Sequence, residues 1–188
     1  MFDYTEAMEC LLRHIVAHCP DFARVDMDRV VVASMRTRSP GARGVYASVM
    51  PLRFKDGATT MKRRGRAYSM PEIHVGGAEM LYLVYFALPR FADLDFRTKI
   101  TTVFHELYHI GPEFDGDIRR FPGRNYAHGH SRRKYNEMMQ KLADEYLSLP
   151  ESELPTSFLK MTFKELESRY DGICGRRVRS PRPKPCSG

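Results

Sequence analysis

The sequence predicts an α+β fold in which helices pack against one small sheet. Apolar residues recur at helical spacing near the start of the chain and again in its second half. Between these regions, residues 29–88 contain short runs of β-branched and aromatic residues separated by Gly and Pro, which is typical of strands. The order of helix, three or four strands, then helices favours helices on one sheet. At 188 residues, the chain is long enough for one compact core.

The first helix is expected over residues 5–19, TEAMECLLRHIVAHC. Met8, Leu11, Leu12 and Ile15 lie three or four positions apart, so they share one helical face. Pro20 follows and ends the helix because it has no N–H to donate.

The central region is expected to form strands at residues 29–37, 44–54, 66–75 and 79–88. Pro51 marks the second of these as interrupted or at an edge, because proline cannot donate to a strand ladder. Asp56-Gly57 is a hairpin turn signal inside a predicted loop over 55–65. Gly76-Gly77 separates the last two strands.

A strong helix is predicted over residues 94–110, LDFRTKITTVFHELYHI. Its apolar residues recur at helical intervals, either Asp93 or Asp95 can cap its start, and Gly111-Pro112 ends it abruptly.

An irregular loop is expected over 112–130, followed by a helix over 131–149 with Ser131 as its cap and a short helix within 157–170. We expect residues 1–174 to form a single domain. Residues 175–188 are rich in Pro and Arg and poor in apolar side chains, so we expect a disordered basic tail.

Composition favours a cytoplasmic protein. No apolar run reaches membrane-spanning length, and the first residues, MFDYTEAMEC, lack the pattern of an export signal. We expect reduced thiols and no zinc ribbon, because the cysteines contain no CxxC pair: Cys10, Cys19, Cys174 and Cys186.

The net charge of +7 is concentrated in basic clusters, at residues 62–66, 119–124, 132–134 and 176–185. Such clusters are compatible with a nucleic-acid partner and equally with a solvated basic surface. No nucleic-acid recognition motif accompanies them.

The stretch HELYH, residues 105–109, predicts a catalytic zinc site. His105 and His109 are four residues apart, so on a helix their imidazoles lie on one face and can share an ion. Glu106 is turned too far around the helix to ligate that ion easily, but it can reach a water on it and serve as general base. His14 and His18 have the same spacing with Ile15 in place of the glutamate, so we interpret them as an ordinary helix face.

A catalytic zinc needs a third protein ligand and one open position. We favour His128, which falls on the core side if the stripe of the following helix is extended back from Tyr135. His130, Asp115 and Glu137 remain as alternatives. Asp115 and Asp117 are also candidates to orient a ligand histidine.

The elements HELYHI, FDGDIRRF and HGHSRRKY resemble the phage-type metallopeptidases and are similar to the SprT/Spartan-like zincins. The resemblance covers roughly residues 28–147. It implies a zincin-like fold with zinc held by His105, His109 and His128, and with Glu106 as the catalytic glutamate acting on a protein or peptide substrate. It also implies that the strand before the metal helix, LYLVYFAL, pairs with an extended substrate.

The sequence leaves two alternatives to a zinc peptidase: a zinc amidase that acts on other substrates, and a nucleic-acid-associated protein with a structural metal. Tyr108, Tyr126 or an arginine of the 119–124 loop is expected to stabilise the transition state.

Overall fold

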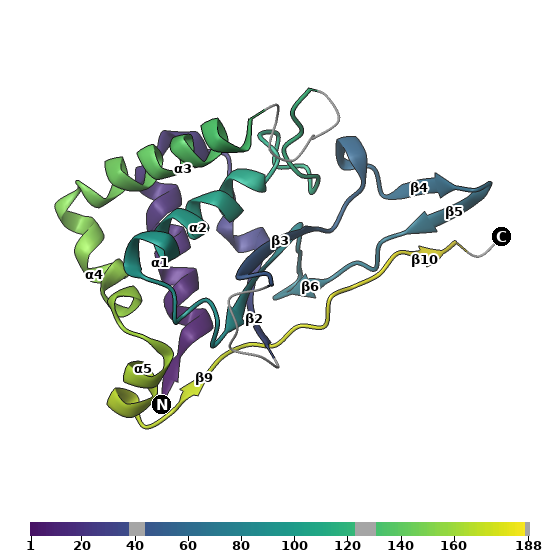
Figure 1. Cartoon of the computed structure of the whole chain (residues 1–188). Helices are drawn as coiled ribbons and strands as arrows, with labels where there is room; N and C mark the ends of the chain where they lie inside the picture. The colour runs from purple at the N-terminus through teal and green to yellow at the C-terminus, as the bar shows by residue number, and fades with distance from the viewer. Residues whose placement is uncertain (38–43, 123–130, 187–188) are drawn as a thin grey trace.

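The computed structural model describes residues 1–37, 44–122 and 131–186, in which helices cover one face of a central sheet (Figure 1). This arrangement is an α+β fold, as predicted. The helices are α1 (Tyr4–His18), α2 (Phe96–His109), α3 (Arg132–Leu147), α4 (Glu153–Thr156) and α5 (Phe163–Tyr170).

The central sheet has the strand order β2-β8-β3. The bounds of these strands are Val30–Arg36 for β2, Ala47–Pro51 for β3 and Tyr82–Leu88 for β8. β8 pairs in parallel with β2 and antiparallel with β3, so both of its edges are occupied. β3 is therefore an edge strand, in agreement with the position of Pro51.

The remaining strands are short and lie outside the central sheet. They are β1 (Phe2–Asp3), β4 (Thr60–Arg63), β5 (Arg66–Ser69), β6 (His74–Val75), β7 (Ala78–Glu79), β9 (Ile173–Cys174) and β10 (Lys184–Pro185). β1 pairs with β9, β6 pairs with β7, and β4, β5 and β10 form an antiparallel sheet with β5 in the middle.

The central sheet buries both faces, which explains the unbroken apolar run of β8. Tyr82, Val84 and Phe86 face the helices and belong to the main core, whereas Leu83 and Tyr85 face a second, smaller core on the other side. The main core thus fixes the helical layer, including α2, against the sheet.

The first turn of α2 is held by polar contacts as well as by packing. Asp95 caps its start by accepting a hydrogen bond from the Thr98 N–H at 2.9 Å. Lys99, only 2% exposed, donates from Nζ to the Leu159 and Met161 carbonyl oxygens at 2.9 and 2.7 Å. Burial lowers the pKa of Lys99, while nearby carboxylates oppose that shift.

Two local predictions for the central region were wrong. The hairpin turn does not lie at Asp56-Gly57, which forms part of a short 3-10 helix, but at Arg64-Gly65 between β4 and β5. In Asp56-Gly57 and in Arg64-Gly65 a residue precedes a glycine, and all four residues have positive φ. The turn signal alone therefore did not distinguish the two sites. The expected strand over 66–75 is divided into β5 and β6, with β6 turning at Gly76-Gly77 into β7.

Residues 175–186, which we expected to be disordered, follow an extended path along the second face of the sheet (Figure 1). The Ser34 N–H donates to the Arg176 carbonyl oxygen at 2.8 Å, and the Cys186 N–H donates to the Ala67 carbonyl oxygen at 2.9 Å. Val178 packs against the second core. The described part of this segment therefore has defined contacts with the rest of the chain.

Within the described ranges, every helix is too short or too polar to span a bilayer.

Candidate metal and catalytic site

The two histidines of the HELYH stretch occupy the last turn of α2 and present their rings to one another. The ring centroids of His105 and His109 are 4.7 Å apart, and the ring planes are 80° from parallel. Two imidazoles bound to one tetrahedral zinc have centroids roughly 5 Å apart. The pair therefore fits two ligands of a common ion.

Tyr135 of α3 packs against both histidine rings. Its ring centroid lies 5.0 Å from that of His105, edge to face, and 6.0 Å from that of His109, nearly parallel. The Tyr135 side chain is buried, and Ser131 caps the helix that carries it by accepting a hydrogen bond from the Lys134 N–H, as predicted. The packing limits the rotamers of both imidazoles and places the start of α3 beside them.

Glu106 lies in a nearly dry position, with 7% of its surface exposed. Its Oε2 accepts a hydrogen bond from the Val49 N–H of β3 at 2.9 Å. Burial raises the pKa of the Glu106 carboxyl to about 7, and the Val49 hydrogen bond opposes the rise. A carboxyl group in this state can both accept and release a proton near neutral pH.

The third ligand cannot be placed, because His128 and His130 lie outside the described residues. Asp115 and Glu137 are described. The Asp115 carboxylate accepts a hydrogen bond from the Asp117 N–H at 3.0 Å, and Glu137 is exposed and pairs with Arg133 at 3.3 Å. No three His, Cys, Asp or Glu side chains converge on a common point within the described ranges, so neither carboxylate completes a site with the histidine pair.

The loop after α2 is held against the sheet by a buried polar network. Tyr82 Oη donates to the Asp117 carbonyl oxygen at 2.7 Å and accepts from the Gly116 N–H at 3.0 Å. Gly116 has a φ of 92°, and a Cβ there would lie 2.4 Å from the Arg53 side chain, so only glycine fits.

Asp117 stabilises the same loop. Burial alone would raise the pKa of its carboxyl, but hydrogen bonds from Arg120, Ile118 and Asp56 outweigh burial and hold the pKa below its ordinary value. Arg120 binds this carboxylate through two hydrogen bonds of 2.8 Å. These contacts join Asp117 to its own loop and to the short 3-10 helix at Lys55–Gly57.

Several of the predicted transition-state stabilisers have other contacts. Arg119 lies over the Tyr108 ring, 4.0 Å from its centroid, and its Nε donates to the Tyr108 carbonyl oxygen at 2.9 Å. The Arg120 guanidinium is bound to Asp117. Tyr126 and Arg124 lie outside the described residues.

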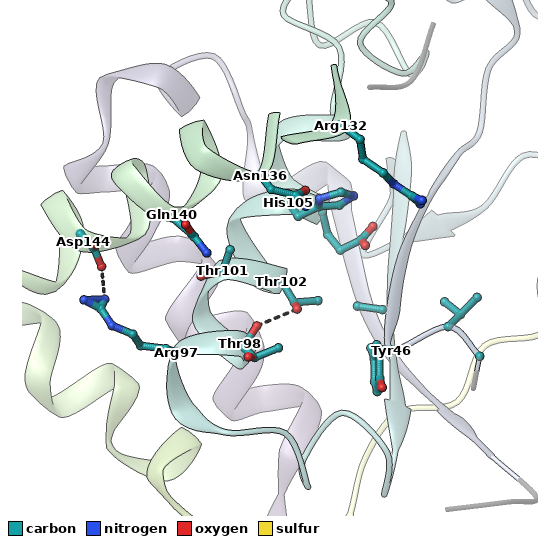
Figure 2. A pocket seen from close by; sticks show the side chains of 14 residues that line it. Tyr46, Arg97, Thr98, Thr101, Thr102, His105, Arg132, Asn136, Gln140 and Asp144 are labelled. Atoms are coloured by element: carbon teal, nitrogen blue, oxygen red, sulfur yellow. Dashed lines mark hydrogen bonds and ion pairs between the residues drawn. The ribbon is translucent and has the colours of Figure 1, made fainter. Parts of the chain in front are cut away.

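His105 and Glu106 line a cavity of about 790 Å³ between α2, α3 and the beginning of β3. Figure 2 shows His105 and Arg132 together at one end of this cavity, Arg97 and Asp144 at the other, and Tyr46 across from α2. Arg97 and Asp144 form an ion pair. Arg132 lines the cavity and has no ion pair or hydrogen bond with any described residue.

Sequence reasoning missed three contributors to this site. Val49 acts through its backbone, which no sequence pattern reports. Tyr135 was assigned to an apolar stripe without its histidine contacts. Arg132 belongs to the basic cluster at 132–134 and follows the predicted cap Ser131, but neither signal places it beside the histidine pair.

The second histidine pair of the chain, in α1, makes different contacts from the pair in α2. His14 and His18 are stacked with ring centroids 4.0 Å apart and planes 19° from parallel. His14 Nδ1 is 2.7 Å from Tyr146 Oη, and His18 Nδ1 is 2.8 Å from the His14 carbonyl oxygen. The Nδ1 atoms of both rings thus bond within the protein, His14 to α3 and His18 to the backbone of its own helix.

A comparison with known families decides the classification. The family described as "Putative phage metallopeptidase" matches residues 2–147.

The chain belongs to this family.

The match begins before the predicted start at residue 28 and includes α1, and it ends at the last residue of α3. Comparisons with curated proteins and with solved structures gave no match. Family membership indicates a metallopeptidase, which agrees with a histidine pair suited to a metal and a buried carboxyl beside it.

Proposed function

We propose that the protein is a zinc-dependent peptidase that hydrolyses peptide bonds with Glu106 as general base. One observation carries this proposal: the imidazoles of His105 and His109 face one another, and His105 and the buried Glu106 line one end of a cavity of about 790 Å³. The chemistry of this donor set fits a hydrolytic zinc site, in which two imidazoles bind the ion and a carboxylate one residue away handles protons.

The metal would be held by His105, His109 and a histidine from the segment before α3. We propose His128, with His130 as the alternative. Support comes from Tyr135, whose contacts with both rings place the start of α3 beside the pair, and His128 is only three residues before the cap Ser131. When bound, the zinc ion would polarise the scissile carbonyl and lower the pKa of the attacking water.

Glu106 would take a proton from that water and deliver it to the leaving amine. Its burial favours this role because a carboxyl with a pKa of about 7 exchanges protons readily near neutral pH. The Val49 N–H holds Oε2 in place at 2.9 Å, so the carboxyl group is oriented before substrate arrives.

The substrate strand cannot pair with LYLVYFAL, as the resemblance implied, because β8 is paired on both sides. The edge of β3 is the better candidate. In its ladder with β8, Tyr46 and Leu52 bond to the partner strand, so Ala47 and Val49 direct their backbone groups away from it. The Val49 N–H on this edge binds Glu106, so a substrate strand would pair with the backbone groups of Ala47. Ala47, the first residue of β3, and residues 44–46 before it line the cavity, so an extended peptide added there would lie beside Glu106.

Arg132 would stabilise the negative charge that develops on the carbonyl oxygen, because it lies beside His105 and has no ion pair with any described residue. We expect Arg132→Ala to lower kcat by about 100-fold with little change in KM, since the contact forms mainly in the transition state. Steady-state kinetics on a peptide substrate would measure kcat and KM separately. Arg132→Lys should recover part of the lost kcat, and the control Lys134→Ala should keep the wild-type kcat. A raised KM with unchanged kcat would instead assign Arg132 to ground-state binding.

A substrate panel tests the proposed function. Purified zinc-loaded protein is expected to cleave an unfolded protein such as reduced casein, with new amino termini identified by mass spectrometry. A chelator should stop cleavage and added zinc should restore it. Hydrolysis of small amides alone would support the amidase alternative. Stoichiometric zinc without hydrolysis of any member of the panel would favour a structural metal.

A further inference from the structure

The second feature of the molecule with a defined chemistry is a basic arm, built from β4, β5 and β10, that projects away from the helices (Figure 1). Lys62 lies opposite Ala67 and Arg63 opposite Arg66, and among the described residues the tip at Arg63 and Arg66 has two strands only. Arg64 and Gly65 form the turn, both with positive φ. β10 pairs with β5 at Ser69 and Tyr68, and the Cys186 N–H bonds to the Ala67 carbonyl oxygen, so β10 covers all of β5 except Arg66.

The arm and the segment leading to β10 carry positive charge alone. Residues 60–69 and 176–186 contain no Asp or Glu. Their nine Lys and Arg residues exceed the net charge of +7, so the remainder of the chain is net negative. The whole charge surplus of the protein is thus confined to two segments that the fold brings together.

Eight of these cations are exposed and lack a carboxylate partner in the described structure: Lys62, Arg63, Arg64, Arg66, Arg177, Arg179, Arg182 and Lys184. Exposed cations elsewhere are often paired, as in Arg24 with Glu113 at 2.7 Å and Lys141 with Glu145 at 3.6 Å. Only Arg176 among the nine is paired, with Glu9 at 3.4 Å. Like charges gathered in adjacent segments repel each other, and a polyanion relieves that repulsion.

The backbone of the segment is fixed, so its cations are not randomly arranged. The Arg176 N–H donates to Thr5 Oγ1 at 2.8 Å, and Ser180 Oγ lies 3.0 Å from Met50 Sδ. The Cys186 N–H bonds to β5 at the Ala67 carbonyl oxygen. The segment therefore lays Arg177, Arg179, Arg182 and Lys184 along the path that leads to the base of the arm.

We propose that this arm binds duplex DNA, with its two-stranded tip in the major groove and the cations of residues 177–184 on the phosphate backbone. A two-stranded β-ribbon fits the major groove of B-form DNA, whereas the major groove of A-form RNA is too deep and narrow for it. Six of the eight unpaired cations are arginines, whose planar guanidinium binds phosphate with two parallel hydrogen bonds. The proposal concerns a different surface from the metal site and does not depend on the proposed activity.

The test measures binding of the full-length protein to a fluorescent 20-base-pair DNA duplex by anisotropy over a range of salt concentrations. In the arm variant, Lys62, Arg63, Arg64 and Arg66 are all changed to Ala. The matched control changes four exposed cations on the helices, Lys134, Lys141, Lys164 and Arg169, and so removes the same charge. Circular dichroism and Tm establish that each variant is folded.

The arm variant is expected to bind DNA at least tenfold more weakly, with the slope of log K against log salt reduced by about three, while the control changes less than threefold. Equal losses in both variants would overturn the proposal, because the attraction would then follow net charge alone. Binding that is equally tight to A-form RNA duplex, heparin or anionic vesicles would also overturn it. The difference in DNA binding between wild type and the arm variant should persist after chelator treatment. Its disappearance would contradict the claim that the arm binds DNA independently of the metal site.

Discussion

Glu106→Gln is expected to lower the rate of peptide hydrolysis by about 1,000-fold while the protein stays folded and keeps its metal. The amide has the shape of the carboxyl group but cannot take a proton from water, and general base catalysis contributes about 100- to 10,000-fold. Its oxygen can still accept the Val49 hydrogen bond. Because the carboxyl is 7% exposed, a neutral side chain there is not expected to lower Tm.

The measurement is the initial rate of casein or peptide cleavage, together with zinc content and Tm of the same preparation. Glu137→Gln is the matched control, since Glu137 is an exposed glutamate on α3 and was an alternative ligand. It should change none of the three quantities. A Glu106→Gln protein that retains zinc and cleaves within threefold of wild type would show that another group accepts the proton.

Substitution of the proposed metal ligands is expected to have the second large effect, a loss of bound zinc. His105→Ala and His109→Ala are each expected to reduce bound zinc to a small fraction of the wild-type content after gel filtration, and to abolish hydrolysis. The reason is that a two-ligand remainder holds zinc far more weakly than a three-ligand site. Zinc per chain, measured by mass spectrometry of the metal, reports this loss without reference to activity.

The same measurement identifies the third ligand. His128→Ala should lose zinc as the first two variants do, and His130→Ala should keep it. The opposite result would assign the ligand to His130, and full zinc in both variants would exclude this segment as its source. His18→Ala is the control, because it removes one member of the other i, i+4 histidine pair, whose Nδ1 bonds to a backbone oxygen. It is expected to leave zinc content unchanged.

Metal addition offers a further readout on the same variants. Zinc should raise Tm in wild type and in His18→Ala, because an ion that binds only the folded chain stabilises it. It should have little effect on Tm in His105→Ala and His109→Ala.

The helices were predicted well because their signals are local. The expected range of α2 began two residues early, and the cap Asp95 was one of two candidates. α3 starts directly after Ser131, as the cap predicted. Helical hydrogen bonds join residues four apart, so a window of one helix contains most of the information that specifies it. The prediction of a hairpin turn at Asp56-Gly57 was wrong because a similar signal, Arg64-Gly65, lies close by in the sequence. The pairing of β4 with β5 places the turn at the second signal.

In the candidate site too, local features could be predicted from the sequence and tertiary contacts could not. The facing rings of His105 and His109 follow from four-residue spacing on one helix, which the sequence alone determined. The Val49 N–H, the Tyr135 ring and the Arg132 guanidinium come from β3 and α3, and their positions depend on how those elements pack around α2. The role of His128 stays a prediction.

The sequence by itself determined the chemical types at the centre of the site and the single helical turn that presents them. Only the tertiary structure decided that Glu106 is buried against an edge strand, that β8 has no free edge, and that the charge surplus gathers on one arm. The physical reason is the separation in sequence of the residues that interact. Helix geometry is fixed by neighbours in sequence, whereas burial, strand pairing and the meeting of residues 60–69 with the end of the chain depend on contacts between distant segments.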